Sequence, residues 1–266
     1  MVPLLSGCTG WLVDLMAFYP RNPPKMRPDL EQINATELFI PSSDNMSLHA
    51  FFFPSDKSDE IILFLHGNSG NVYCRMDIVS ALRDTGINVL LIDYRGFGLS
   101  TGSPTEAGLY EDSAAAFSFI TDQLGYDSEK IFILGRSIGS AAAIYVASGR
   151  DIGGLVLISP LASGKDVMNK SWLWFLSWMA GSSFDNQHMV QDVTAPALII
   201  HGSKDRVIKI ASGRKLYNSM PMTNKQFVEI KGAGHNNMMN RFEERLWQVV
   251  SEFVAETRGM RLAEHR

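Results

Sequence analysis

The stretch Ile131-Phe-Ile-Leu-Gly-Arg-Ser-Ile-Gly-Ser140 runs four apolar residues into a Gly-x-Ser-x-Gly pattern, and small residues follow as far as Ala147. This order predicts a buried strand, a sharp turn and a helix. A serine at the apex of such a turn is exposed at the N-terminus of the helix. A second match, Gly98-Leu-Ser-Thr-Gly102, means that the five-residue pattern alone cannot choose the serine.

The flanking residues separate the two serines. Ser100 follows the glycine-rich run 93–98 and precedes Gly-Ser-Pro104, so neither a strand nor a helix adjoins it. Ser137 has the strand 131–134 before it and the helix 140–147 after it. We therefore expect Ser137 to be a nucleophile and Ser100 to lie in a turn.

Composition limits the class of protein. The 266 residues are 45% hydrophobic, which is enough for a large core and excludes a disordered chain. The net charge of −4 argues against a nucleic-acid surface. The two cysteines, Cys8 and Cys74, make neither a disulfide framework nor a metal cluster. No run of eighteen uncharged apolar residues predicts a complete transmembrane helix.

Residues 1–30 form a lead-in with a Pro-rich linker at 20–28. Within it, Leu5-Ser-Gly-Cys8 resembles a bacterial lipobox, although only seven residues precede Cys8 and a signal peptide needs roughly 15–30. Two interpretations stay open. Either the true start lies upstream and Cys8 anchors an envelope lipoprotein to the membrane, or the match is accidental and the protein is cytoplasmic.

Residues 31–266 alternate between predicted strands and helices. The runs 36–40 and 48–53 are too close for an intervening helix and predict an antiparallel hairpin. The later strands are expected at 61–65, 87–92, 131–134, 155–158, 197–200 and 227–230, and the helices at 72–84, 104–124, 140–147, 209–218 and around 242–253. The helix at 104–124 begins with a predicted capping box, Ser103 and Glu106 around Pro104. Eight strands predict an α/β fold with one doubly wound, mostly parallel sheet.

The connection at about 160–195 interrupts this rhythm. It carries Ser171-Trp-Leu-Trp-Phe-Leu-Ser-Trp-Met179, with three of the five tryptophans. We interpret it as a small lid over the carboxyl edge of the sheet, where α/β sheets bind ligands. A helix that only covers the domain, and a contact with a membrane surface, are the alternatives.

A serine nucleophile needs a base and an acid that orients the base. His235 lies in a glycine-rich loop directly after the strand that ends at Ile230, and Asp205 follows the strand 197–200. The order Ser, Asp, His is that of the α/β hydrolases. Weaker candidates for the base are His188, His201 and His265, and weaker candidates for the acid are Asp185 and Asp192. Asp205 could also be an ordinary helix cap.

Hydrolysis of an acyl bond also requires backbone donors for the oxyanion. One donor is expected from Ile138, the residue after the nucleophile. The other is expected from the loop His66-Gly-Asn-Ser-Gly70 after the third strand, with Asn68 as the donor. Its two glycines allow the backbone to approach a substrate closely.

Five motifs together resemble the α/β-hydrolase superfamily, in particular its dipeptidyl-aminopeptidase-like or α/β-hydrolase-domain branch, which includes depalmitoylating thioesterases. They are His66-Gly-Asn-Ser-Gly-Asn71, Asp93-Tyr-Arg-Gly-Phe-Gly-Leu-Ser-Thr-Gly102, Gly135-Arg-Ser-Ile-Gly139, His201-Gly-Ser-Lys-Asp205 and Gly232-Ala-Gly-His235. The resemblance implies a Ser137–Asp205–His235 triad and hydrolysis without metal or cofactor. It does not identify the substrate.

We therefore predict a serine hydrolase that cleaves carboxylic ester or thioester bonds of a small-molecule or lipid-like acyl substrate. An aminopeptidase-like amide hydrolase is one alternative. A membrane-tethered binding protein that kept the fold without turnover is the other. The sequence contains no information on the oligomeric state.

Overall fold

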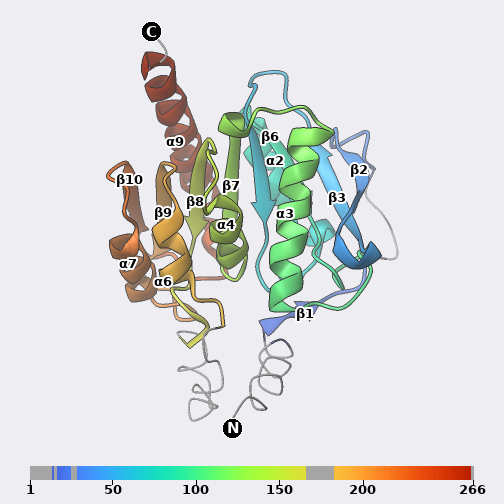
Figure 1. Ribbon diagram of the computed structural model, residues 1–266, viewed down its shortest axis with the longest axis horizontal. Coiled ribbons are helices and arrows are strands. Elements are labelled where there is room, and N and C mark those ends of the chain that lie inside the picture. Colours follow the sequence, from blue (N-terminus) through green and yellow to red (C-terminus); the bar gives the residue numbers. More distant parts are fainter. Residues whose placement is uncertain (1–13, 15–16, 25–28, 166–182, 265–266) are drawn as a thin grey trace.

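The computed structural model describes residues 14, 17–24, 29–165 and 183–264, and its centre is an eight-stranded sheet (Figure 1). The strand order is β10-β9-β8-β7-β4-β6-β3-β2. The strands are β2 (Thr36–Pro41), β3 (Ser47–Phe53), β4 (Ile61–Leu65), β6 (Asn88–Ile92), β7 (Ile131–Arg136), β8 (Gly154–Ile158), β9 (Ala197–Gly202) and β10 (Lys225–Ile230). The six neighbouring strands β10, β9, β8, β7, β4 and β6 pair in parallel. The β2–β3 hairpin adds an antiparallel edge next to β6. The predicted fold class is confirmed.

The central strands are buried on both faces. In β4, Ile61, Leu63 and Leu65 pack into one core, whereas Ile62 and Phe64 pack into the other. Successive side chains of a strand point to opposite faces, so an uninterrupted apolar run requires cover on both sides.

Helices supply that cover. One face is packed by α3 (Glu106–Asp122), α4 (Gly139–Ala147) and α7 (Ile210–Ser219). The other face is packed by α2 (Met76–Asp84) and α9 (Glu243–Glu264). Figure 1 shows α3 and α4 side by side over the middle of the sheet. Within the described ranges, the short α-helices are α6 (Asn186–Met189) and α8 (Met238–Arg241).

The predicted capping box at the start of α3 is wrong. The N-cap is Thr105, whose hydroxyl accepts a hydrogen bond from Gly108 N–H at 3.0 Å. Pro104 lies before the cap, where it packs so tightly on the preceding loop that a Cβ at Gly96 would meet Pro104 Cδ at 2.6 Å. The first turn therefore begins at Glu106, two residues later than the local pattern predicts. The helix also ends at Asp122 instead of Leu124.

The position of β4 determines where a ligand can bind. β4 and β7 are neighbours in the sheet. After β4 the chain continues to β6, on the side of β2, whereas after β7 it continues to β8, on the side of β10. Crevices form where neighbouring parallel strands diverge in this way, outside their carboxyl ends. The loop after β4 and the turn after β7 flank that point, and both were predicted to carry functional groups.

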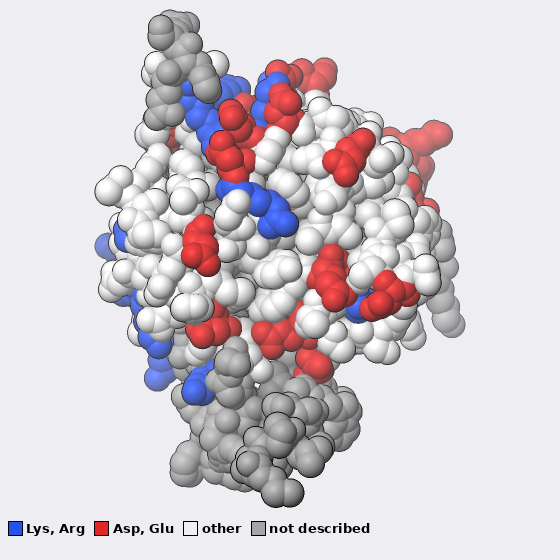
Figure 2. All heavy atoms as spheres, in the orientation of Figure 1, with Lys and Arg blue, Asp and Glu red and all other residues white. Residues whose placement is uncertain are grey.

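Charges are mixed on the face seen in Figure 2, where acidic side chains alternate with smaller groups of lysine and arginine. No helix among the described residues is long and apolar enough to cross a membrane. Cys8 and the tryptophan-rich run 171–179 lie outside the described residues.

Candidate active site

Ser137 is held at a sharp turn between β7 and α4. Its φ of 55° lies in the left-handed region, and its N–H donates to Ile158 O at 3.0 Å. The glycines on either side leave no room for a side chain. A Cβ at Gly135 would lie 2.4 Å from Gly139 O, and a Cβ at Gly139 would lie 2.2 Å from Leu65 O. The turn is therefore possible only with glycine at both flanking positions.

Three side chains from three loops meet at this turn. His235 Nε2 lies 3.1 Å from Ser137 Oγ, and His235 Nδ1 lies 2.8 Å from Asp205 Oδ2. Ser137 follows β7, Asp205 follows β9 and His235 follows β10. The Ser137 and His235 residues are each 8% exposed, whereas the Asp205 side chain is fully buried. The structure thus brings together the serine, base and acid that the sequence predicts.

Asp205 is both an orienting group and a local cap, because its two oxygens have different partners. Oδ1 accepts hydrogen bonds from Val207 N–H at 2.9 Å and Ile208 N–H at 2.8 Å. Oδ2 faces His235, and His201 Nε2 lies 3.5 Å from the same oxygen. Burial by itself would raise the pKa of the Asp205 carboxyl. The hydrogen bonds from His201, His235 and the backbone outweigh it and hold the pKa well below its usual range.

The loop after β4 lies directly against Ser137. A Cβ at Gly67 would stand 3.5 Å from Ser137 Cβ, so the next residue, Asn68, follows immediately beside the serine. In the described part of the chain, neither Asn68 N–H nor Ile138 N–H donates to a protein acceptor. Two such N–H groups beside a serine are what an oxyanion hole requires.

Asp93 and Tyr94, the first two residues of the motif 93–102, hold the base of this loop. Asp93 Oδ1 accepts from Val72 N–H at 2.9 Å and lies 3.3 Å from His66 Nε2. The Tyr94 hydroxyl donates to His66 O at 3.0 Å. Asp93 and Tyr94 follow β6, the neighbour of β4, and this long-range pairing has no local signature.

Arg136, next to the serine, was also missed. Its Nη2 donates to His235 O at 3.0 Å, so it links the turn after β7 to the histidine loop. Its Nη1 would stand 3.3 Å from a Cβ at Gly67, which places the guanidinium between the two loops. Burial lowers the pKa of Arg136 to about 10, and the positive charge of Arg75 acts in the same direction. The sequence signal was a charged residue at the carboxyl end of a buried strand.

The other candidates lie elsewhere. Ser100 Oγ donates to Asp93 O at 2.7 Å and accepts from His49 N–H at 2.8 Å, which is a turn as expected. Asp185 caps α6 by accepting from His188 N–H. Asp192 ends a short 3-10 turn, and His265 lies outside the described residues. Among the described residues, no group of three His, Cys, Asp or Glu side chains could hold a metal ion.

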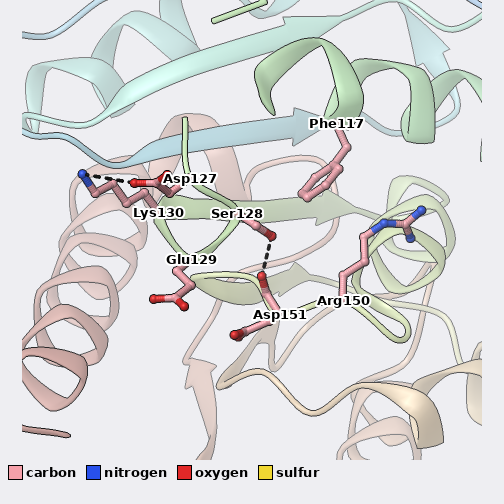
Figure 3. Close-up of a pocket in the computed structure, with 7 residues that line it drawn as sticks. All are labelled: Phe117, Asp127, Ser128, Glu129, Lys130, Arg150 and Asp151. Atoms are coloured by element: carbon pink, nitrogen blue, oxygen red, sulfur yellow. Dashed lines mark hydrogen bonds and ion pairs between the residues drawn. The ribbon is translucent and has the colours of Figure 1, made fainter. Parts of the chain in front are cut away.

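A separate hollow lies at the opposite end of β7 (Figure 3), beside its first residue, Ile131. Its walls are largely charged, and the lining residues are Phe117, Asp127, Ser128, Glu129, Lys130, Arg150 and Asp151. The Ser128 hydroxyl is hydrogen-bonded to Asp151 O, and the Arg150 guanidinium lies 5.5 Å from the centre of the Phe117 ring. Because the hydroxyl in this lining is bonded to a backbone carbonyl and no histidine faces it, the hollow lacks a nucleophile–base pair.

This fold and this site define an α/β hydrolase, and comparisons with known proteins agree. The model of the family described as "Serine aminopeptidase, S33" matches residues 56–189 and 182–241. The chain belongs to this family of the α/β-hydrolase superfamily and is a hydrolase.

Relatives of similar sequence include two animal proteins. The chain is 36% identical over 186 residues to the α/β hydrolase domain-containing protein aho-3 of Caenorhabditis elegans, covering 70% of this chain but only 55% of that protein. It is 31% identical over 226 residues to the human α/β hydrolase domain-containing protein 17C, covering 83% of this chain and 67% of the human protein.

Solved structures support the fold. An esterase from Pyrococcus furiosus superposes with a TM-score of 0.72 at 22% identity, covering 90% of this chain and 98% of the esterase. A monoacylglycerol lipase from Paleococcus ferrophilus superposes with a TM-score of 0.63 at 20% identity, covering 79% of this chain and 99% of the lipase.

Proposed function

We propose that this hydrolase cleaves carboxylic ester or thioester bonds through an acyl-enzyme intermediate on Ser137. The observation that carries the proposal is the hydrogen-bond chain from Ser137 Oγ through His235 to Asp205. A serine hydroxyl is a weak nucleophile until a base accepts its proton, and His235 Nε2 is within reach of that proton.

In the proposed reaction, Ser137 Oγ attacks the acyl carbonyl while its proton passes to His235 Nε2. Asp205 keeps the imidazole in the tautomer whose Nε2 is free to accept, and stabilises the imidazolium that forms. The N–H groups of Asn68 and Ile138 hold the oxyanion of the tetrahedral intermediate. His235 then returns the proton to the leaving alcohol or thiol, and water releases the acyl group by the same steps.

The amide-cleaving alternative has one supporting observation, the description of the family as a serine aminopeptidase. An aminopeptidase needs an acidic group for the free amine of its substrate. Within the described residues, Asp205 is the carboxylate bonded to His235, and none is bonded to Ser137. We therefore place ester and thioester substrates first.

Two measurements test the proposal. A fluorophosphonate probe should label the wild-type protein at Ser137 and leave Ser137→Ala unlabelled. A panel of p-nitrophenyl esters of graded chain length, acyl thioesters and aminoacyl amides should show turnover of esters and thioesters above that of amides. Labelling without turnover of any acyl substrate would favour the non-catalytic binding protein. Faster cleavage of amides would favour the aminopeptidase.

A further inference from the structure

The N-terminal strand β1 (Tyr19–Pro20) is hydrogen-bonded to the loop that carries Asn68. It pairs in parallel with β5 (Ser69–Gly70), which is the second half of that loop. Tyr19 N–H donates to Asn68 O at 2.7 Å, and Arg21 N–H donates to Gly70 O at 3.2 Å. Figure 1 shows β1 at the end of the molecule toward which β6 points, beyond the main sheet.

A buried side chain strengthens this pairing. Asn71, which is 1% exposed, donates from Nδ2 to Arg21 O at 3.0 Å and to Asn22 O at 2.9 Å. Its Oδ1 accepts from Cys74 N–H at 3.2 Å and so caps the turn that leads into α2. The segment after β1 is thereby tied to the residue that ends the loop.

Phe18 anchors the strand at its other end. Its ring is 6% exposed and makes edge contacts with Phe97 at 6.2 Å and Phe184 at 6.4 Å between ring centres. Phe97 in turn contacts the ring of His66, the first residue of the loop, at 5.3 Å. An apolar contact therefore supports the backbone pairing on the side of the loop where β4 ends.

The two glycines of the loop 66–70 give its backbone conformational freedom, which contacts with other segments must restrict. Gly67 and Gly70 flank Asn68 and Ser69, and glycine adopts conformations closed to other residues, as Gly70 does with φ 88°. Asn68 follows Gly67, where a Cβ would stand 3.5 Å from Ser137 Cβ, and its C=O accepts the hydrogen bond from Tyr19 N–H. Rotation about Asn68 or Gly67 would turn the donor away from the oxyanion.

We propose that β1 is a positioning strand for the oxyanion hole, with the N–H of Tyr19 fixing Asn68 in the orientation that catalysis uses. The inference rests on the proposed function, since it assigns β1 a role in the same reaction. Tyr19 itself acts through its backbone, because its side chain is 55% exposed.

The test compares Tyr19→Pro, which removes the N–H, with Tyr19→Ala, which keeps it. Full loss of one oxyanion donor costs about 10²–10³ in rate, so misalignment in Tyr19→Pro should lower kcat by about 10- to 100-fold. KM and the pH profile of kcat should stay at wild-type values, because substrate contacts and His235 are untouched. Affinity for a trifluoromethyl ketone, which forms the tetrahedral oxyanion, should fall by the same factor as kcat. Tyr19→Ala should match the wild type.

If Tyr19→Pro does not fold, the role of β1 is tested with Arg21→Pro, which removes the N–H that donates to Gly70 O. Its control is Arg21→Ala, which keeps that N–H. Wild-type kcat in the folded proline variants would overturn the inference, as would a change in KM equal to that in kcat. Failure of the proposed function is a different result, since Ser137→Ala would then keep its activity. An inactive Ser137→Ala together with fully active proline variants would refute only the role of β1.

Discussion

Among the described residues, two clusters each place an aspartate that follows a strand between two histidines, and in one of them an imidazole nitrogen lies within hydrogen-bonding distance of a serine hydroxyl. Asp205 lies between His201 and His235, and His235 continues to Ser137. Asp93 lies 3.3 Å from His66 and 3.7 Å from His49, close to Ser100 in the second Gly-x-Ser-x-Gly match.

The two clusters differ in the partner of the imidazole nitrogen that does not face the aspartate. His235 turns its second nitrogen to the hydroxyl of Ser137, a residue that is 8% exposed. In the Asp93 cluster, His66 Nδ1 faces Gly67 O at 2.6 Å and His49 Nε2 faces Glu37 Oε1 at 2.7 Å. All three side chains of that cluster are fully buried. Similar residues therefore form a candidate proton relay in one place and a scaffold for the loop after β4 in the other.

We expect the largest difference in kcat between the two clusters when the serine of each is replaced by alanine. Ser137→Ala should lower kcat by about 10⁶, the scale observed when a nucleophilic serine of a triad is removed. Ser100→Ala leaves His49 N–H without its acceptor, which should cost about 1–3 kcal/mol of stability and leave the chemistry in place. Ester turnover and urea denaturation measure the two effects. Comparable kcat values for Ser137→Ala and Ser100→Ala would contradict a catalytic role for Ser137 and a structural role for Ser100.

Replacement of the two aspartates is the next test. Asp205→Asn should lower kcat by about 10⁴, because the amide favours the wrong tautomer of His235. Asp93→Asn keeps an oxygen that can accept from Val72 N–H, so its effect on kcat should be far smaller. Steady-state kinetics on one p-nitrophenyl ester compares them directly. A larger loss in Asp93→Asn would mean that the scaffold, and not the acid, limits the reaction.

Arg136 connects the two loops of the candidate site, and its removal should have a smaller effect. Arg136→Met deletes the donor to His235 O, and a lost hydrogen bond from a charged group is worth about 1.5–3 kcal/mol. We expect kcat to fall by about 10- to 100-fold, with partial recovery in Arg136→Lys. If Arg136→Met lowers only the melting temperature, the residue stabilises the fold without positioning His235.

The smallest effect is expected in the pH dependence of stability. The pKa of Asp205 is lower in the folded protein than its ordinary value of about 3.9, so ionised Asp205 stabilises the fold above that pH. This contribution is lost only as the pH falls through the folded pKa. The difference in melting temperature between the wild type and Asp205→Asn should therefore not narrow between pH 8 and about 5, and should shrink in stronger acid. Narrowing already near pH 6 would contradict the lowered pKa.

Local sequence was sufficient where one segment determines its own structure. The strand before Ser137, the glycines around it and the small-residue helix after it could be identified because close packing leaves room only for those residue types. The order of strands and helices placed Asp205 and His235 at strand ends. Parallel strands align their carboxyl ends at one edge, so the meeting of these residues could be predicted as well.

Other features depend on residues far apart in the chain. The bond from Arg136 to His235 spans 99 positions, and the pairing of Tyr19 with Ser69 joins a segment before the sheet to a loop inside it.

The sequence by itself therefore determined the fold class, the strand–turn–helix unit around Ser137 and the likeness to α/β hydrolases, since these follow from local packing and from the order of elements. The tertiary structure alone decided which aspartate–histidine cluster faces a serine and which segment holds Asn68. Hydrogen bonds depend on distance and direction to within a few tenths of an ångström, and only the folded chain sets these.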